Sequence, residues 1–250
     1  MLVSQQNYRH LVVFSGGLDS TTVAWMLKGE APGVLLYYLY HGHRRQAAQV
    51  NMLAERLGMR VQMWNIIELM AILTAPGCGY VPGYRAIGYV SALAMADRFD
   101  IPFLYTGELE APFYSWQLAD DPEVRHYERE KKVGVGGYTG REGSIQNRSI
   151  LATWYGEKAY RDPRAFQFID PIGGLSKAGV ARLATRLGVP VADTISCPDE
   201  SELPPGVNHC GACGCCISRR AGFIVAGLSD PTTYQQLPPV PPEYLIDPAP

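Results

Sequence analysis

A run of seven residues near the N-terminus has the composition of a phosphate-binding loop. It consists of Ser15, Gly16, Gly17, Leu18, Asp19, Ser20 and Thr21. Paired glycines let the backbone curl so that successive N–H groups point at one anion, and a helix that starts directly afterwards adds its positive end. The hydroxyls of Ser15, Ser20 and Thr21 can donate to phosphate oxygens, and Asp19 can hold Mg²⁺. The alternative is a plain strand-to-helix turn in which Asp19 or Ser20 only caps the helix.

Five of the six cysteines crowd into one short stretch near the C-terminus. Cys197, Cys210, Cys213 and Cys216 include two pairs separated by two residues, a spacing that lets thiolates converge on one tetrahedral Zn²⁺. Four ligands leave no open position, so the pattern predicts a structural zinc site. Cys215 is an extra thiol with poorer spacing, and it could replace Cys213 or Cys216. Buried or redox-active cysteines are the alternative interpretation.

Strand and helix patterns alternate along the chain around these residues. Short apolar runs predict strands at 11–14, 34–40, 61–67 and 103–106, and apolar periodicity or alanine-rich sequence predicts helices at 21–28, 45–57, 88–99 and 177–187. This alternation predicts an α/β fold built on a doubly wound parallel sheet. The stretch 111–154 shows no core strand, and it is either a functional lid or disordered.

The length of 250 residues fits one sizeable domain with a small appendage. We expect a phosphate-binding α/β domain at 1–190, a four-cysteine zinc subdomain at 191–228 and a Pro-rich tail at 229–250. Because prolines cluster at 238–242, we expect the tail to form an extended strap without packed secondary structure.

Composition and charge exclude several classes of protein. With 47% hydrophobic and 18% charged residues the chain is not intrinsically disordered. A net charge of -2 argues against a nucleic-acid partner, since each phosphate contact needs a Lys or Arg. No apolar run is long enough to span a membrane, and the polar N-terminus lacks the order of a signal peptide. We therefore expect a cytoplasmic protein.

The phosphate loop resembles the Ser-Gly-Gly-x-Asp-Ser loop of the PP-loop ATP pyrophosphatases. It lacks the lysine of the Walker loop found in kinases and GTPases. The resemblance implies a HUP-like, Rossmann-like fold and a site for ATP and Mg²⁺. It also implies attack on the α-phosphorus of ATP, which forms an adenylate and releases pyrophosphate.

Five segments together resemble the 7-cyano-7-deazaguanine synthase family. They are 15–21, 40–44, 81–85, 171–177 and the stretch from Ser196 through the cysteines to Arg219, Gly222 and Phe223. The resemblance implies a carbon–nitrogen ligase that converts 7-carboxy-7-deazaguanine to the nitrile with ATP and ammonia. It also implies a homodimer.

The resemblance assigns roles to individual residues. Lys177 matches a family lysine that neutralises the triphosphate, and with Asp19 and Ser20 it forms the expected catalytic set. His43 and Arg44 are candidates for contact with nucleotide or substrate, although an exposed polar turn explains them almost as well. Arg85 is a candidate substrate-binding residue whose role stays open, because Arg85 stands where the family has Asn.

The segment after Gly107 departs from the family sequence that forms much of the deazaguanine pocket. Its candidate substrate-binding residues are Glu108, Glu110, Phe113, Tyr114 and Trp116. These aromatic rings and carboxylates could still stack on a purine and accept its N–H groups. The departure implies a diverged relative, similar to the synthase-like proteins of bacterial anti-phage operons.

Four functions follow as hypotheses. The first is adenylation of a deazaguanine-type acid and its transfer to ammonia. The second uses a protein amine as acceptor, with 111–150 and the tail as docking surfaces. The third is a non-catalytic nucleotide-binding scaffold, and the fourth is a tRNA thiolase, which the near-neutral charge and the four-cysteine pattern fit poorly.

Overall fold

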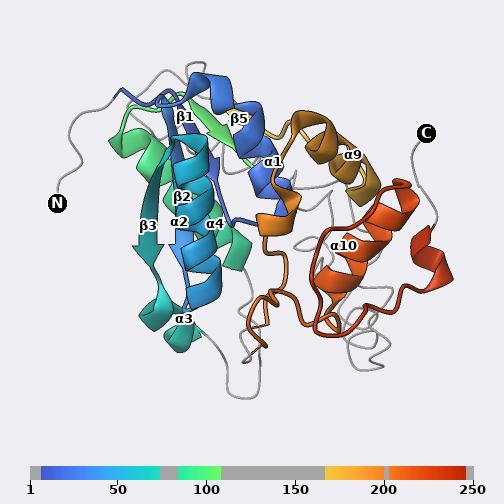
Figure 1. Ribbon diagram of the computed structural model, residues 1–250. Helices are drawn as coiled ribbons and strands as arrows, with labels where there is room; N and C mark the ends of the chain where they lie inside the picture. The colour runs from blue at the N-terminus through green and yellow to red at the C-terminus, as the bar shows by residue number, and fades with distance from the viewer. Residues whose placement is uncertain (1–6, 74–83, 108–166, 200–202, 246–250) are drawn as a thin grey trace, which may run out of the picture.

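The computed structural model describes residues 7–73, 84–107, 167–199 and 203–245, and within them a five-stranded parallel sheet forms the centre (Figure 1). The strands are β1 (His10–Val13), β2 (Val34–Tyr40), β3 (Arg60–Asn65), β4 (Phe103–Tyr105) and β5 (Gln167–Ile169). Their order is β3-β2-β1-β4-β5, and each neighbouring pair is parallel. The prediction of a parallel α/β sheet is confirmed.

Helices cover both faces of the sheet. Neighbouring residues of each strand point to opposite faces, so that each strand contributes side chains to two buried clusters. Val12 and Leu36 pack in one buried cluster with residues of α1 (Leu18–Met26), α2 (Arg44–Leu57) and α9 (Lys177–Leu187). Leu11 and Leu35 pack in a second cluster with α4 (Tyr84–Arg98). The sheet is therefore doubly wound, as predicted.

Several elements differ from the expected ones. The helix after the phosphate loop begins at Leu18 rather than at 21, and β3 ends at Asn65, where α3 (Ile67–Leu73) follows. β5 was missed because its three residues are an exposed-to-intermediate edge strand without an apolar run. Helix α10 (Gly214–Val225) was also missed, since the cysteine spacing dominated that stretch. Short 3-10 helices lie at Lys28–Glu30 (η1), Val191–Asp193 (η3) and Pro242–Leu245 (η4).

The strand order places the phosphate loop at the point where the sheet reverses its winding. From β1 the chain moves outward through β2 and β3, and it then returns to the other side of β1 for β4 and β5. In open α/β sheets the crevice outside the carboxyl ends of the strands at this reversal is the usual ligand site. The loop after β1 lies there.

Helices α9 and α10 form a unit beside α1, to the right of the sheet in Figure 1. The close approach of α10 to α9 depends on Gly222, because a Cβ at this position would lie 2.4 Å from Cγ and 3.1 Å from the carbonyl carbon of Lys177. Glycine therefore lets α10 pack against the first residue of α9.

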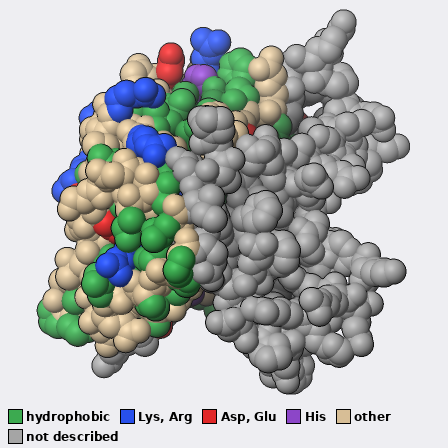
Figure 2. Space-filling model, turned by 90° about the vertical axis from the view of Figure 1, so that its right-hand side faces the viewer, with side chains coloured by type: hydrophobic (Ala, Val, Ile, Leu, Met, Phe, Trp, Pro, Cys, Tyr) green, Lys and Arg blue, Asp and Glu red, His purple; other side chains and the backbone are tan. Residues whose placement is uncertain are grey.

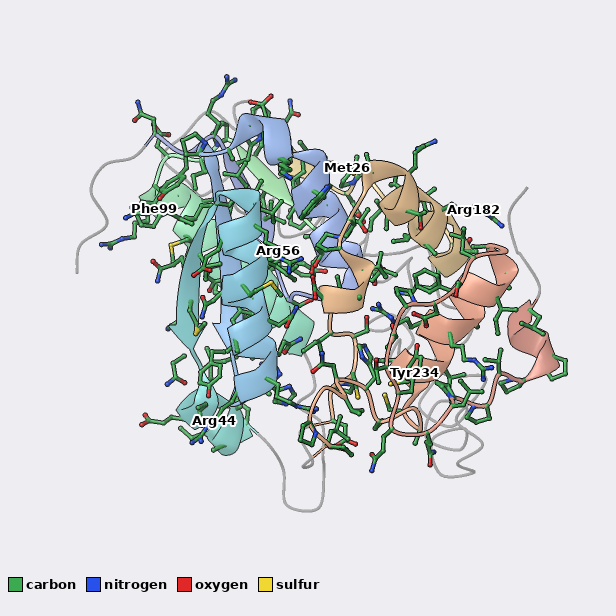
Figure 3. All side chains as sticks on the ribbon, in the orientation of Figure 1. Met26, Arg44, Arg56, Phe99, Arg182 and Tyr234 are labelled. Atoms are coloured by element: carbon green, nitrogen blue, oxygen red, sulfur yellow. The ribbon has the colours of Figure 1, made fainter. Side chains whose placement is uncertain are left out.

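The tail is more structured than the expected strap. The backbone N–H of Gln235 donates to the carbonyl of His209 at 2.8 Å, and a Cβ on Gly211 would lie 1.7 Å from the carbonyl oxygen of Gln236. Figure 3 shows Tyr234 beside the lower part of α10. Helix η4 then packs against α10. The expectation of a tail without packed secondary structure was wrong, because the polyproline-like pattern does not reveal these tertiary contacts.

The surface of the described part is mixed in character. On the face shown in Figure 2, Lys and Arg side chains stand among hydrophobic and other groups. None of the helices within the described ranges has the length and apolar character needed to cross a membrane.

Arg219 joins three segments of the C-terminal part from a position that is only 1% exposed. Its Nε donates to the hydroxyl of Thr232 at 2.7 Å, and its Nη1 donates to the hydroxyls of Thr194 at 2.8 Å and Ser196 at 3.1 Å. Its Nη2 donates to the carbonyl of Val191 at 2.9 Å. The guanidinium thus ties α10 to the segment before the cysteines and to the tail.

We expect Arg219→Met to lower the free energy of unfolding by roughly 3–5 kcal/mol, because it leaves buried polar partners without their donor. Urea unfolding of the metal-loaded protein measures this change. Arg186→Met, on the exposed last turn of α9, is the matched control and should change stability by about 0.5 kcal/mol or less. Equal effects of the two substitutions would contradict the assigned role.

Candidate nucleotide site and cysteine centre

The phosphate loop is curled by its glycines. Gly16 has a φ of 71°, a backbone conformation that residues other than glycine rarely adopt. A Cβ at this position would lie 3.1 Å from Cγ2 of Val50. The N-cap of α1 is Gly17, and no side chain caps the helix. Neither Asp19 nor Ser20 therefore caps α1 with its side chain, contrary to the capping that the alternative assumed. The loop instead presents the uncapped N-terminus of α1.

Two serines brace this curl. The hydroxyl of Ser20 accepts from the backbone N–H of Ser15 at 3.1 Å and lies 3.1 Å from the Ser15 hydroxyl. It also donates to the carbonyl of Gly17 at 3.3 Å. Leu18 is buried in the core. Thr21 has no exposed surface, and its Oγ1 has no hydrogen-bond partner among the described residues.

Asp19 and Lys177 meet although they are 158 positions apart in the sequence. The Nζ of Lys177 lies 2.8 Å from Oδ1 and 2.6 Å from Oδ2 of Asp19. Both side chains keep about a quarter of their surface exposed, at 22% for Lys177 and 27% for Asp19. A lysine at the first position of a helix is unfavourable against the helix dipole. The carboxylate of Asp19 offsets that charge and leaves both groups accessible to a ligand.

Gly107, at the end of β4, lies against the first turn of α1. A Cβ on Gly107 would lie 2.9 Å from the backbone nitrogen of Ser20 and 3.0 Å from the carbonyl carbon of Asp19. The loops that follow β1 and β4 therefore converge at the reversal of the sheet.

Only some of the other predicted site residues lie within the part of the chain that the structure describes. His43 is the N-cap of α2, and its ring centroid lies 4.1 Å from that of His41. Arg44 is exposed at the start of α2, at the lower end of that helix in Figure 3. Arg85 lies in the first turn of α4, but its side chain lies outside the described residues. Glu108, Glu110, Phe113, Tyr114 and Trp116 also lie outside them.

A polar face of α2, which the sequence analysis missed, holds the segment 193–199 that leads into the cysteines. Arg45 donates to the carbonyl of Asp199, Gln49 donates to the carbonyl of Asp193, and Arg56 pairs with the carboxylate of Asp193. Their helical spacing places the three donors on one face of α2, and this spacing could have revealed the polar face from the sequence. The partners could not be inferred, because they lie far away in the sequence.

The four predicted metal ligands come together. The sulfurs of Cys197, Cys210, Cys213 and Cys216 all lie within 4.8 Å of one another. The sulfur–sulfur distances are 3.6 Å for Cys197–Cys210, 3.8 Å for Cys197–Cys213 and 3.4 Å for Cys213–Cys216. A tetrahedral ion with metal–sulfur bonds of about 2.3 Å requires sulfurs about 3.8 Å apart. The four side chains could thus hold one metal ion, whereas a four-iron cluster needs its sulfurs further apart because each binds a different iron.

Cys215 is not part of this group, since its side chain is exposed and it is absent from the converging set. Among the ligands, the pKa of Cys213 is lowered because neighbouring thiols, Cys197 foremost, donate to its sulfur. Donation to Cys213 in turn raises the pKa of Cys197 to about 11. Four thiolates this close repel one another, so all four can ionise together only around a cation.

His209 supports the centre as a neutral side chain. Burial foremost, together with the nearby charge of Arg219, lowers its pKa to about 4. The Nε2 atom of His209 accepts from the backbone N–H of Ser196 at 3.1 Å, and the ring packs edge-on against Tyr234. His209 therefore fixes the backbone beside Cys197.

Comparison with known proteins identifies the family. A family model described as queuosine biosynthesis protein QueC matches residues 150–227. The 7-cyano-7-deazaguanine synthase of Anaeromyxobacter sp. (strain Fw109-5) is 30% identical over 235 residues, which cover 91% of this chain and 97% of that relative. The chain belongs to the 7-cyano-7-deazaguanine synthase family. The synthase of Solidesulfovibrio magneticus is 31% identical over 235 residues, covering 90% of this chain and 95% of the relative.

Solved structures resemble this member of the 7-cyano-7-deazaguanine synthase family more distantly. A U34-tRNA thiolase of Methanococcus maripaludis, solved with its 4Fe-4S cluster, has a TM-score of 0.46 and 14% identity, covering 80% of this chain and 63% of that one. A 4-thiouridine synthetase solved with RNA and bound ATP has a TM-score of 0.45 and 16% identity, covering 72% and 40%. Likenesses this loose carry no information about ligands.

We expect one metal ion per chain, held by four of the cysteines of this synthase-family protein. Elemental analysis of the purified protein should show Cys210→Ser losing most of the metal, because a tetrahedral site with three thiolates is incomplete. Cys215→Ser is the matched control and should keep the full metal content. Loss of metal from Cys215→Ser to the same extent would show that the ligand set is a different one.

Proposed function

We propose that this protein is an ATP-dependent ligase that adenylates the carboxylate of 7-carboxy-7-deazaguanine or a close analogue and transfers the acyl group to an amine. The pairing of Lys177 with Asp19 beside the uncapped N-terminus of α1 carries this proposal. A partly exposed ammonium group and a carboxylate beside this helix end support binding of a phosphate group and its cation. Relatives named 7-cyano-7-deazaguanine synthase support the choice of acid and product.

The proposed reaction has two activation steps. A carboxylate oxygen of the acid attacks the α-phosphorus of ATP, which forms an acyl-adenylate and releases pyrophosphate. Ammonia then attacks the acyl carbon, and AMP leaves as the amide forms. The amide oxygen attacks a second ATP in the same way, and loss of AMP and a proton gives the nitrile. Adenylation is needed because an unactivated carboxylate oxygen is a poor leaving group.

Different residues around the loop bind different groups of ATP. The hydroxyl of Ser15, the backbone of Gly16 and Gly17 and the N-terminus of α1 bind phosphate oxygens. The ammonium group of Lys177 neutralises charge that builds up on the leaving pyrophosphate. Ser20 keeps the loop curled and can turn its hydroxyl to a phosphate. Mg²⁺, which Asp19 would hold, adds further positive charge when it is bound.

Binding of ATP in this way requires the ion pair to open. The Nζ of Lys177 spans both carboxylate oxygens of Asp19 at 2.8 and 2.6 Å, so a phosphate oxygen and a cation must replace these contacts. Because both side chains are partly exposed, the exchange needs no unfolding of the core. Thr21 fits a structural role better than phosphate contact, because its side chain, like that of Leu18, is buried.

His43 and Arg44 are proposed to contact nucleotide or substrate at the adjacent edge of the sheet. They follow β2, which lies next to β1, so their backbone stands at the same carboxyl edge as the phosphate loop. The four-cysteine centre is proposed to hold Zn²⁺ in a structural role, since four thiolate ligands leave no position for substrate.

Mass spectrometry of protein incubated with ATP, Mg²⁺, 7-carboxy-7-deazaguanine and ammonium tests the proposal. We expect AMP together with an amide or nitrile product, and we expect Asp19→Ala to lower product formation about a hundredfold or more. Glu55→Ala, on the exposed surface of α2, removes a carboxylate outside the site and should retain activity.

Absence of AMP would contradict the ligase and favour a non-catalytic nucleotide-binding scaffold. AMP formed without a free product would keep the activation step and direct the search to a protein amine as acceptor.

A further inference from the structure

The segment 193–199 touches the phosphate loop on one side and enters the four-cysteine centre on the other. The backbone N–H of Ile195 donates to the carbonyl of Gly16 at 3.0 Å. A Cβ on Gly17 would lie 3.5 Å from the carbonyl oxygen of Ile195, so the two backbones are in close contact. Cys197, the first of the four cysteines, follows two positions later and is buried.

Helix α10 makes a second connection between the two sites. It starts within the cysteine centre and includes Cys216. One turn later Arg219 donates to the hydroxyls of Thr194 and Ser196, which flank Ile195. A further turn along, Gly222 packs directly against Lys177, the residue that pairs with Asp19.

Both connections begin at side chains that a metal ion would hold together. Without a cation the four thiols are joined by weak hydrogen bonds, at sulfur–sulfur separations of 3.4 to 3.8 Å and with backbone N–H donors at 3.4 Å from the sulfurs of Cys197 and Cys210. With a cation they form one rigid centre. Because Ile195 and Gly222 are attached to this centre by short stretches of backbone, the placement of Gly16 and Lys177 depends on it.

We propose that metal binding at the four-cysteine centre and ATP binding at the phosphate loop are thermodynamically coupled, with Gly222 as the positioning residue that transmits the coupling to Lys177. The inference rests on the proposed function in that it takes ATP as the ligand of the loop. Coupling of this kind is reciprocal, so ATP must strengthen metal binding by the same factor by which metal strengthens ATP binding. The cysteine centre is then part of the nucleotide site's organisation as well as of its stability.

Equilibrium competition for Zn²⁺ between the full chain and a chromophoric chelator tests this, with and without saturating ATP. We expect ATP to tighten zinc binding about fivefold or more in the wild type. Gly222→Ala should lose most of this shift, because its Cβ displaces Lys177 from Asp19. Gly214→Ala makes the same change on the same helix in open space and should keep the shift. Binding of zinc by ATP in solution is the same for all three proteins and cancels in the comparison.

Calorimetry of ATP binding on the same samples distinguishes a failure of the coupling from a failure of ATP binding itself. Equal zinc affinity with and without ATP, in protein that does bind ATP, would overturn the coupling and leave the proposed function standing. No ATP binding at all would overturn both. A full shift in Gly222→Ala would overturn the route through α10. If Gly222→Ala does not retain zinc, Ser196→Ala, which removes an acceptor of Arg219, takes its place with the same expectation.

Discussion

The contact between Lys177 and Asp19 is the interaction on which the arrangement of this protein depends. It joins the first helix after the phosphate loop to a helix 158 positions later in the sequence. A cation at the first turn of α9 and a carboxylate at the first turn of α1 can face each other only if both helices start at the same edge of the sheet. The doubly wound topology provides that edge, and Gly107 and Gly222 provide the space around it.

Close contacts around this ion pair connect the cysteine centre to the phosphate loop. Arg219, buried among Val191, Thr194, Ser196 and Thr232, binds the segment that lies on Gly16. The polar face of α2 holds the same segment from the other side through Arg45, Gln49 and Arg56. The loop proposed to bind ATP is thus held by contacts from segments that lie far from it in the sequence.

The sequence allowed prediction of features that depend on neighbours along the chain. The buried strand Val34–Tyr40 and the helix Lys177–Leu187 have the predicted bounds, since continuous apolar runs and a capping glycine mark them locally. The four cysteines converge as their spacing predicted. The edge strand β5, the packed tail and the contact of Gly222 with Lys177 depend on partners distant in sequence, so no local pattern marks them. Burial of Thr21 was likewise hidden, because a threonine in the first turn of a helix can face either phosphate or core.

Lys177 and Asp19 are proposed to serve attack on the α-phosphorus of ATP. Exchange of labelled pyrophosphate into ATP tests this role most directly, because only cleavage between the α and β phosphates allows such exchange. We expect exchange that requires 7-carboxy-7-deazaguanine and falls about a hundredfold or more in Lys177→Met. Exchange at the wild-type rate in Lys177→Met, or formation of ADP and phosphate without exchange, would contradict the account.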